Sequence, residues 1–492
     1  MKSLHSRYDP QGEAERYLAA VPIPPETRCF VLIEPGLGYM IPVLARRFPE
    51  ARIIALHLAP PGEGGIPAFS DSPAFSDFST GQDSEAVHWY PGGGPGPEDF
   101  LDRELEKADR GGLLGTAESI KIIEWRPALN YYGKLYAEVL AAAAAAIRRF
   151  DAGRRTLRAF GHRWFRNFFR NLALLRRFPV YRELTIPVLV TGAGPSLEDS
   201  LPLIREVREG GCFIIAASSS FMALSKGGIV PDLVLSTDGG PWALLHLYEL
   251  FRGLNPPAIA AAFSAGLPSQ CGDLPLLGIS DGSLWQGLIL RGLGIPHLIL
   301  PQRGTVTATA LDLAFALGRG KVCIAGMDLD TQDIRSHCRP YSFDRLQREG
   351  ASRFYTEYGR LFSRCFAMKE GGSHRVYAEW FAGRLASYAG RLYTLGKNNP
   401  LFADLPRAAP GTLWPGEEKS GGGALIRLAP VKAPVAAALE ILRAGLEDRK
   451  TGPALSEELG PLLLPGVKNA GTGELWETVE SLTGGSGGGP HG

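Results

Sequence analysis

The segment 192–199, GAGPSLED, has the composition of a ligand-binding turn, and it directly follows an apolar run expected to form a strand. Gly192 and Gly194 permit backbone conformations that are barred to other residues, and they let a ligand approach the main chain closely. The amides around Ser196 would face outward near the start of the next helix, an arrangement that binds anions. An ordinary tight turn is the alternative, but G-x-G-P-S-L is longer than such a turn requires and therefore favours a ligand site.

Carboxylates follow two further apolar runs. Asp238 ends the run in PDLVLSTDGG, where it could accept ribose hydroxyls, hold a metal ion or only cap a turn. Asp328 and Asp330, in GMDLD, form a D-x-D pattern, which in many glycosyltransferases holds a divalent cation bridging a sugar-nucleotide diphosphate. So short a pattern often arises by chance, and Asp328 is the stronger candidate because it stands at a strand end.

Hydroxyl and basic side chains complete the candidate set. In RGTVTATALD, Thr305 and Thr307 stand where a helix should begin, so their hydroxyls could bind an anion or a base edge, or act only as caps. Arg303 could pair with a phosphate. His337 lies in a polar loop downstream and could deprotonate an acceptor hydroxyl. An inert surface histidine is the alternative, and His374 is a rival for the same role.

These candidates are spread over a region, 181–406, in which apolar runs alternate with helical patterns. Such alternation predicts an open α/β domain with a parallel sheet and helices on both faces. Sheets of this kind bind ligands at the carboxyl ends of their strands, which is where the candidates stand. The strands are expected at 187–191, 212–218, 232–237, 258–263, 297–301, 321–326 and 391–396.

A second α/β unit is expected at 1–130, where CFVLIEPGLGYMIPVLARRFPEARIIAL has the pattern of a Rossmann-like strand, turn, helix and strand. The turn holds Gly36 and Gly38, but the second strand ends at His57 rather than at the acidic residue that would hold a ribose hydroxyl. We therefore expect this unit to be structural and to bind no nucleotide. It should contain a long disordered insertion at about 60–115.

The remaining segments are expected to be mainly helical. Residues 131–180 form a connector rich in arginine and aromatic residues, which we interpret as an amphipathic helix packed on a neighbouring domain. A surface for a membrane or for RNA is the alternative interpretation. Residues 407–483 are expected to be a mainly helical C-terminal region, and 484–492 a disordered tail.

Composition excludes several classes of protein. The 52 Lys and Arg against 51 Asp and Glu leave a net charge of +1, which argues against a nucleic-acid binder. The longest apolar run, 139–147, is too short for a membrane span of about 20 residues. The first residues lack the apolar stretch of a secretory signal, and the six cysteines form no C-x-x-C pair. We therefore expect a reduced, cytoplasmic protein.

The segments GAGPSL, PDLVLSTDGG, RGTVTATALDLAFALG and CIAGMDLD, in this order and spacing, resemble the domain family named for the archaeal 6-hydroxymethylpterin diphosphokinase MptE. The same domain forms the core of bacterial motility accessory factors (Maf), the flagellin nonulosonic-acid glycosyltransferases. PGLGYMIPVLARRFPEARIIAL and RWFRNFFRNL resemble the N-terminal unit and the connecting helix of Maf proteins, and they favour the Maf group. The resemblance implies a sialyltransferase-like (MptE-like) α/β domain behind a Rossmann-like one.

A more distant resemblance, to bacterial CMP-sialic-acid sialyltransferases, implies how a donor would bind. The turn would cradle the phosphate and ribose of CMP, the threonines would contact the nucleotide, and Asp328 would lie in the donor pocket. The chain departs from the Maf pattern at Met327, where Gln is usual, and at Arg303-Gly304, where Gly-Gly is common. The candidate donor-site residues are Gly192, Gly194, Pro195, Ser196, Leu197, Asp238, Arg303, Thr305, Thr307, Asp328 and Asn399, with His337 as the catalytic residue.

Three functions remain open. The resemblance implies a glycosyltransferase that moves a CMP-activated nonulosonic acid to Ser or Thr of flagellin or a related surface protein. It would require no cofactor, because CMP leaves as a stable phosphate monoester. A Mg-ATP-dependent 6-hydroxymethylpterin diphosphokinase is the alternative, in which Asp238, Asp328 and Asp330 would hold Mg²⁺. The third is a non-catalytic protein that binds flagellar partners.

Overall fold

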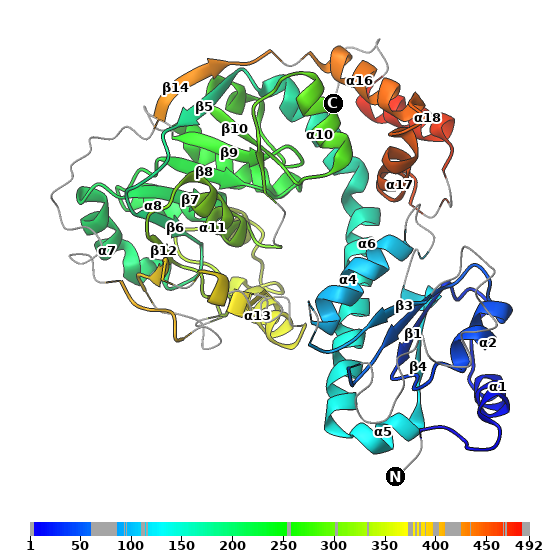
Figure 1. Ribbon diagram of the computed structural model, residues 1–492. Coiled ribbons are helices and arrows are strands. Elements are labelled where there is room, and N and C mark those ends of the chain that lie inside the picture. Colours follow the sequence, from blue (N-terminus) through cyan, green and yellow to red (C-terminus); the bar gives the residue numbers. More distant parts are fainter. Residues whose placement is uncertain are drawn as a thin grey trace. The chain divides into compact units, whose positions relative to one another are not determined.

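A computed structural model shows two compact units, which are described separately (Figure 1). One comprises residues 1–162 and 446–492, and the other comprises residues 163–445. The predicted C-terminal region, 407–483, is therefore divided between the two units. The structure describes residues 4–60, 86–92, 94, 96–109, 114, 117–252, 257–300, 304–331, 334–371, 377–378, 381–382, 385–388, 390–396, 403–408, 425–432, 434–465, 467 and 470–484.

The first unit contains a four-stranded parallel sheet in the order β3-β2-β1-β4, as expected of a Rossmann-like unit. The central strand, β1, is CFVLI, and all five of its residues are buried. Part of the region expected to be a disordered insertion is ordered, because it supplies β3 and α4; residues 61–85 lie outside the described residues. The strands are β1 (Cys29–Ile33), β2 (Arg52–Leu56), β3 (Val87–Trp89) and β4 (Ile120–Glu124).

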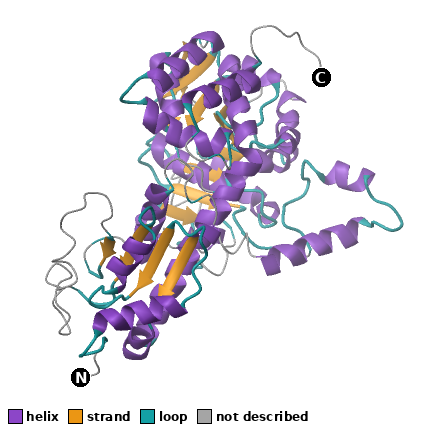
Figure 2. Ribbon diagram, turned by 90° about the vertical axis from the view of Figure 1, so that its right-hand side faces the viewer, coloured by secondary structure: helices purple, strands orange, loops and turns teal. Residues whose placement is uncertain are grey.

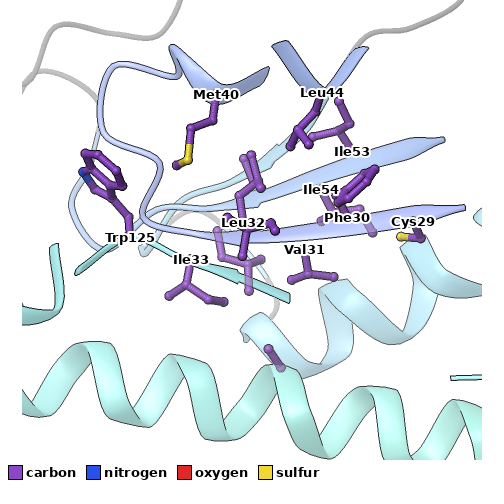
Figure 3. Close-up of a cluster of buried hydrophobic side chains, with 14 of the residues drawn as sticks. Cys29, Phe30, Val31, Leu32, Ile33, Met40, Leu44, Ile53, Ile54 and Trp125 are labelled. Carbon is purple, nitrogen blue, oxygen red and sulfur yellow. The ribbon is translucent and has the colours of Figure 1, made fainter. Parts of the chain in front are cut away.

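Helix α2 buries an apolar face against the sheet. Met40 and Leu44 are four residues apart on α2 and lie over the buried residues of β1 and β2 (Figure 3). Each such side chain contributes about 1.5–3 kcal/mol by leaving water. The helices are α1 (Pro10–Ala20), α2 (Met40–Arg47), α4 (Pro97–Ala108), α5 (Arg126–Tyr132), the first part of α6 (Lys134–Leu174), α17 (Gly452–Leu463) and α18 (Thr472–Thr483).

The carboxyl edge of the first sheet is closed by a buried carboxylate. Glu34 accepts hydrogen bonds from the amides of Gly36 (3.1 Å) and Leu58 (2.7 Å). His57 lies 3.7 Å from Glu34, and its Nε2 lies 3.0 Å from Nδ1 of His88. Two amides at this glycine turn and strand end are thus bonded by the protein itself, which fits the expected structural role.

The second unit contains an eight-stranded sheet in the order β11-β10-β9-β8-β7-β6-β12-β13, and all its strand pairs are parallel (Figures 1 and 2). The predicted open α/β fold is therefore confirmed. The strands are β6 (Val188–Thr191), β7 (Phe213–Ala217), β8 (Leu233–Ser236), β9 (Ala258–Ala262), β10 (Leu276–Ser280), β11 (Leu298–Ile299), β12 (Val322–Ala325) and β13 (Leu392–Thr394).

Strand β10 was missed by the sequence analysis. Its sequence, LLGIS, follows a proline and contains Gly278, so it has the composition of a loop. The structure explains the glycine, because a Cβ at Gly278 would lie 2.5 Å from the ring of Phe263 on the neighbouring segment. The close approach of an aromatic ring, rather than a turn, is what requires glycine here.

The order of the strands reverses at β6. From β6 the chain runs outward through β7, β8, β9 and β10 to β11, and it then returns to place β12 on the other side of β6. In open α/β sheets the loops that leave such a switch point diverge and form a binding crevice. The candidate turn follows β6 and the D-x-D follows β12, so both candidates stand at this point.

Helices of the second unit flank this sheet, and α11 packs against β6, β7 and β12 (Figure 1). Residues 177–180 close the region expected to be a helical connector, but they belong to a strand, β5, that pairs with β14 in an antiparallel ribbon. The bounds are α7 (Leu197–Glu209), α8 (Phe221–Lys226), α9 (Leu244–Leu247), α10 (Leu284–Gly292), α11 (Val306–Leu317), α12 (Asp344–Glu349), α13 (Glu357–Gly371), α16 (Val435–Glu447, which continues beyond this unit), β5 (Arg177–Tyr181) and β14 (Leu425–Pro430). In the described part of the chain, no helix combines the length and the apolar character that crossing a membrane requires.

Candidate functional site

The loops that follow β6 and β12 touch backbone to backbone. The amide of Gly194 donates to the carbonyl of Gly326 at 2.7 Å, and Gly326 has a φ of +67°. A Cβ at Gly192 would lie 2.5 Å from that carbonyl oxygen, and one at Gly194 would lie 2.5 Å from Oδ2 of Asp328. The glycines of G-x-G-P-S-L are therefore required by the close contact of two loops at the switch point.

Asp328 binds the turn directly. Its Oδ2 accepts a hydrogen bond from the amide of Ser196 at 2.8 Å, and its Oδ1 accepts one from the Ser196 hydroxyl. Ser196 precedes α7, so its amide is one of the donors that an N-terminal anion site offers. The structure thus brings together Gly192, Gly194, Ser196 and Asp328, and a carboxylate of the protein occupies part of the predicted cradle.

The other residues of the turn are buried. Leu197 begins α7 with no exposed surface, so its side chain is part of the core. The carbonyl of Pro195 accepts a hydrogen bond from the amide of Glu198 at 3.2 Å. The side chains of Pro195 and Leu197 therefore support the turn from inside the protein. Contacts with a donor would have to come from the main chain of the turn.

The two candidate threonines, Thr305 and Thr307, make different contacts. Thr305 is the N-cap of α11, and its hydroxyl accepts a hydrogen bond from the amide of Ala308 at 3.1 Å. Oγ1 of Thr307 would be 2.9 Å from a Cβ at Gly192, so this hydroxyl lies against the turn. Two predicted donor residues, Arg303 and Asn399, lie outside the described residues, as does the rival base His374.

The loop that carries His337 is bonded to the same turn. The amide of Cys338 donates to the carbonyl of Ala193 at 2.8 Å. Nδ1 of His337 lies 2.8 Å from the Ser336 hydroxyl, and its ring stacks on Tyr341 with centroids 4.3 Å apart. His337 is therefore fixed in orientation beside the glycine turn, as a catalytic base would have to be.

Glu198 is a residue that the sequence analysis missed. Its Oε1 accepts hydrogen bonds from Nη1 of Arg335 and from the amide of Arg339, both at 2.7 Å. One carboxylate in the first turn of α7 thus holds both sides of the His337 loop. An acidic residue at the start of a helix is common, so nothing in the sequence separates Glu198 from an ordinary helix-stabilising residue.

Asp238 lies at the carboxyl end of β8 and is exposed. Its Oδ1 accepts a hydrogen bond from the amide of Gly240 at 2.7 Å, which is the turn-capping role that the sequence left open. The negative charge of Asp238 also acts on His246 and on Tyr341, and burial raises the pKa of Tyr341. Tyr341 is also the ring on which His337 stacks.

His246 gives the second unit a dependence on pH. Burial lowers the pKa of His246 from 6.5 to about 4, against the opposing charge of Asp238, and its Nδ1 has no hydrogen-bond partner among the described residues. Between those pH values the unfolded chain binds a proton that the folded chain does not, so the free energy of unfolding falls as the pH falls. At about 1.4 kcal/mol per pH unit, acidification from pH 7 to pH 5 should cost about 2 kcal/mol at this site.

His246→Phe keeps a ring against Tyr341 and Phe343, so it should lose less stability than the wild type on the same acidification. Urea unfolding of both proteins at pH 7 and pH 5 measures the difference. Equal losses would show that His246 is not the group that titrates.

The candidate metal ligands are not gathered. Among the described residues, no group of three or more His, Cys, Asp and Glu side chains could hold a metal ion. Asp330 is exposed and accepts a hydrogen bond from the amide of Thr331 at 2.7 Å, whereas both oxygens of Asp328 are bonded to Ser196. In the diphosphokinase alternative, Mg²⁺ would therefore depend on ligands from the nucleotide.

The end of α6 supports the same edge of the sheet from outside the sequence motifs. The side-chain amide of Asn171 donates to the carbonyls of Phe263 (2.8 Å) and Ala265 (2.7 Å), beyond the end of β9. Asn167 donates to the carbonyl of Gly239 at 3.2 Å. Phe165, Phe168 and Phe169 of this segment are buried, and Phe168 packs on Phe263, as expected of a connector that packs on a domain.

Comparison with known proteins identifies the domain that carries the turn. Residues 162–333 match the family described as 6-hydroxymethylpterin diphosphokinase MptE-like. A protein of Treponema pallidum (strain Nichols) described as uncharacterized is 31% identical over 229 residues, which are 45% of this chain and 47% of that protein. A 6-hydroxymethyl-7,8-dihydropterin pyrophosphokinase of Methanothermobacter thermautotrophicus is 31% identical over 156 residues, 31% of this chain and 61% of that enzyme.

A solved structure is similar over more of the chain. The Maf glycosyltransferase from Magnetospirillum magneticum AMB-1 superposes with a TM-score of 0.52 and covers 96% of this chain and 77% of its own, at 14% identity. This likeness concerns the fold, and the chain spans only about half to three-fifths of the two curated relatives. The resemblance to sialyltransferases stays a prediction. Residues 162–333 are thus an MptE-like domain, in a chain that has the fold of a Maf glycosyltransferase.

Proposed function

We propose that the protein is a cytoplasmic glycosyltransferase that moves a nonulosonic acid from a CMP-activated donor to a Ser or Thr hydroxyl of flagellin or a related surface protein. The observation that carries the proposal is the junction at the switch point. There the turn after β6 contacts the loop after β12, and the His337 loop is bonded to the turn through Cys338 and Ala193. The Maf-like fold supports a role of the same kind.

The reaction is a direct displacement at the anomeric carbon. The acceptor oxygen forms a bond to that carbon, the bond from carbon to the phosphate oxygen of CMP breaks, and CMP leaves with the electron pair. CMP is a phosphate monoester and already a stable anion, so the enzyme needs positive potential and backbone amides around it. The hydroxyl proton passes to a base as the new bond forms.

This chain supplies candidates for each task. The amides near the start of α7, several of which are bonded by the protein itself in this structure, and the hydroxyl of Thr307 would lie against the phosphate and ribose of CMP. His337 would accept the proton of the acceptor hydroxyl, because Ser336 and Tyr341 fix its ring beside the turn. Asp328 would position the turn through its two bonds to Ser196.

A Mg-ATP-dependent pterin diphosphokinase is a second candidate, favoured by the family match of residues 162–333 and by the archaeal relative. It would place ATP at the same turn, because the amides that suit CMP also suit a diphosphate. The two functions differ in their need for a metal ion.

Calorimetric titration with CMP in EDTA, and with ATP plus Mg²⁺, separates these functions. Saturable CMP binding without metal is the expected result. Binding of Mg-ATP alone would replace the proposal with the diphosphokinase, and binding of neither would favour a non-catalytic protein that binds flagellar partners. For titrations of variants in the glycine turn, Gly153→Ala is a suitable control, because a Cβ at Gly153, in the middle of α6, would meet no atom within 4 Å.

A further inference from the structure

A polar pocket lies beside the candidate donor turn. Its lining borders about 310 Å³ of space, which includes open solvent, between the His337 loop and helices α12 and α13. The side chains that bear on its chemistry are Arg335, Ser336, His337, Arg339, Tyr341 and Arg364. Three of the nine lining residues are arginines and one, Asp344, is acidic, so the excess of positive charge suits an anion.

The three arginines are engaged to different degrees. Arg335 is bound by Glu198 at 2.7 Å, and Arg339 lies 3.6 Å from Glu357. Arg364 forms no ion pair with a carboxylate in the part of the chain that the structure describes, and its side chain is exposed. Its guanidinium therefore has donors available for a ligand.

The acidic residue in the lining offsets only part of this charge. The carboxylate of Asp344 accepts a hydrogen bond from the amide of Tyr341 at 2.8 Å and keeps its negative charge, but three arginines stand against it. A planar guanidinium binds a carboxylate through two parallel hydrogen bonds, and such charge-assisted pairs are stronger than neutral ones. Leu361 adds an apolar surface for the part of a ligand that carries the acid group.

The pocket and the donor turn are held together. Arg335, Cys338 and Arg339 of the pocket loop bind Glu198 and Ala193, which belong to the turn and to the first residues of α7. A ligand whose nucleotide lies on the turn could therefore extend its sugar toward the arginines. The wall of the pocket would not have to move.

We propose that this pocket is the subsite for the carboxylate of an acidic sugar, with Arg364 as the main binding residue. The inference rests on the proposed function, and it assigns the side chain that would bind the carboxylate of the donor sugar. A neutral sugar would leave Arg364 without its partner.

Two pairs of probes test the subsite. The first pair is CMP-N-acetylneuraminic acid against CMP, measured by calorimetry. The second is N-acetylneuraminic acid against its methyl ester, measured by ligand-observed NMR, and it needs no nucleotide site. We expect the acid to bind and the ester not to bind, and we expect the CMP-sugar to bind more tightly than CMP.

Arg364→Gln should weaken binding of CMP-N-acetylneuraminic acid by about tenfold or more, because a charge-assisted hydrogen bond is lost, and should leave CMP unchanged. Arg364→Lys should retain part of the affinity. Arg345→Gln removes an equal charge from α12 outside the pocket, where Arg345 pairs with Glu349. This control should leave the affinity for both ligands unchanged.

The outcomes separate the subsite from the function. If Arg364→Gln weakens the binding of CMP and of CMP-N-acetylneuraminic acid equally, the pocket binds the phosphate. The assignment of the carboxylate subsite is then wrong. If the acid and its ester bind alike, the assignment is wrong as well. If CMP and CMP-N-acetylneuraminic acid both fail to bind but the free acid binds through Arg364, the proposed function fails while the acid subsite stands.

Discussion

Gly194→Ala is expected to weaken CMP binding by about tenfold or more and to lower the free energy of unfolding by about 1–3 kcal/mol. The added Cβ would lie 2.5 Å from Oδ2 of Asp328 and 2.8 Å from the carbonyl oxygen of Gly326. The carbonyl belongs to the main chain, so relief requires the turn after β6 to separate from the loop after β12. That separation would displace the amides proposed to hold the nucleotide.

Calorimetry with CMP and urea unfolding measure the two effects on Gly194→Ala. Gly153→Ala is the matched control, because its Cβ would meet no atom within 4 Å inside a helix. Alanine is the better helix former there, so this variant should gain about 0.5–1 kcal/mol and bind CMP normally. Unchanged CMP affinity in Gly194→Ala would show that the turn does not hold the nucleotide.

Asp328→Ala is the second change expected to have a large effect. It removes the acceptor for both the amide and the hydroxyl of Ser196, whose exposed fraction is only 3%. A buried donor left without a partner costs about 1–3 kcal/mol of stability. CMP binding should fall as well, because the turn loses the contact that fixes its position.

Asp330→Ala tests the other residue of D-x-D. Asp330 is exposed and bonds only to the neighbouring amide of Thr331 among the described residues, so its loss should change stability by less than about 0.5 kcal/mol. Asp328→Asn keeps one acceptor oxygen, so its loss of stability should lie between those of Asp328→Ala and Asp330→Ala. Equal effects of Asp328→Ala and Asp330→Ala on unfolding and on CMP titration would contradict this division of roles.

The positions of most strands in the second sheet could be predicted, because these buried strands are short apolar runs, some of which are followed by glycine or aspartate. The run at 187–191 appears as Val188–Thr191, and the glycine turn and Asp328 stand at strand ends as predicted. Periodicity and turn chemistry are local properties, so the sequence states them directly.

Features that depend on distant partners could not be predicted. Strand β14 pairs with β5 across more than 200 residues of sequence, and neither segment has a local pattern that requires a strand. The two bonds of Glu198 to the His337 loop, and those of Asn171 to the loop after β9, likewise join residues far apart in the chain. The roles of these residues depend on tertiary contacts, which local sequence composition does not reveal.

The bonds between the glycine turn and the His337 loop have an energetic consequence for the proposed binding of a ligand. Ordering a flexible side chain or loop when a ligand binds costs about 0.5–1.5 kcal/mol for each immobilised side chain. Hydrogen bonds to Glu198 and Ala193 already hold the loop at Arg335, Cys338 and Arg339. Most of the ordering of this loop therefore takes place during folding. In the proposed reaction the site would be preorganised, so binding free energy from the nucleotide would remain available to stabilise the transition state instead of ordering the loop.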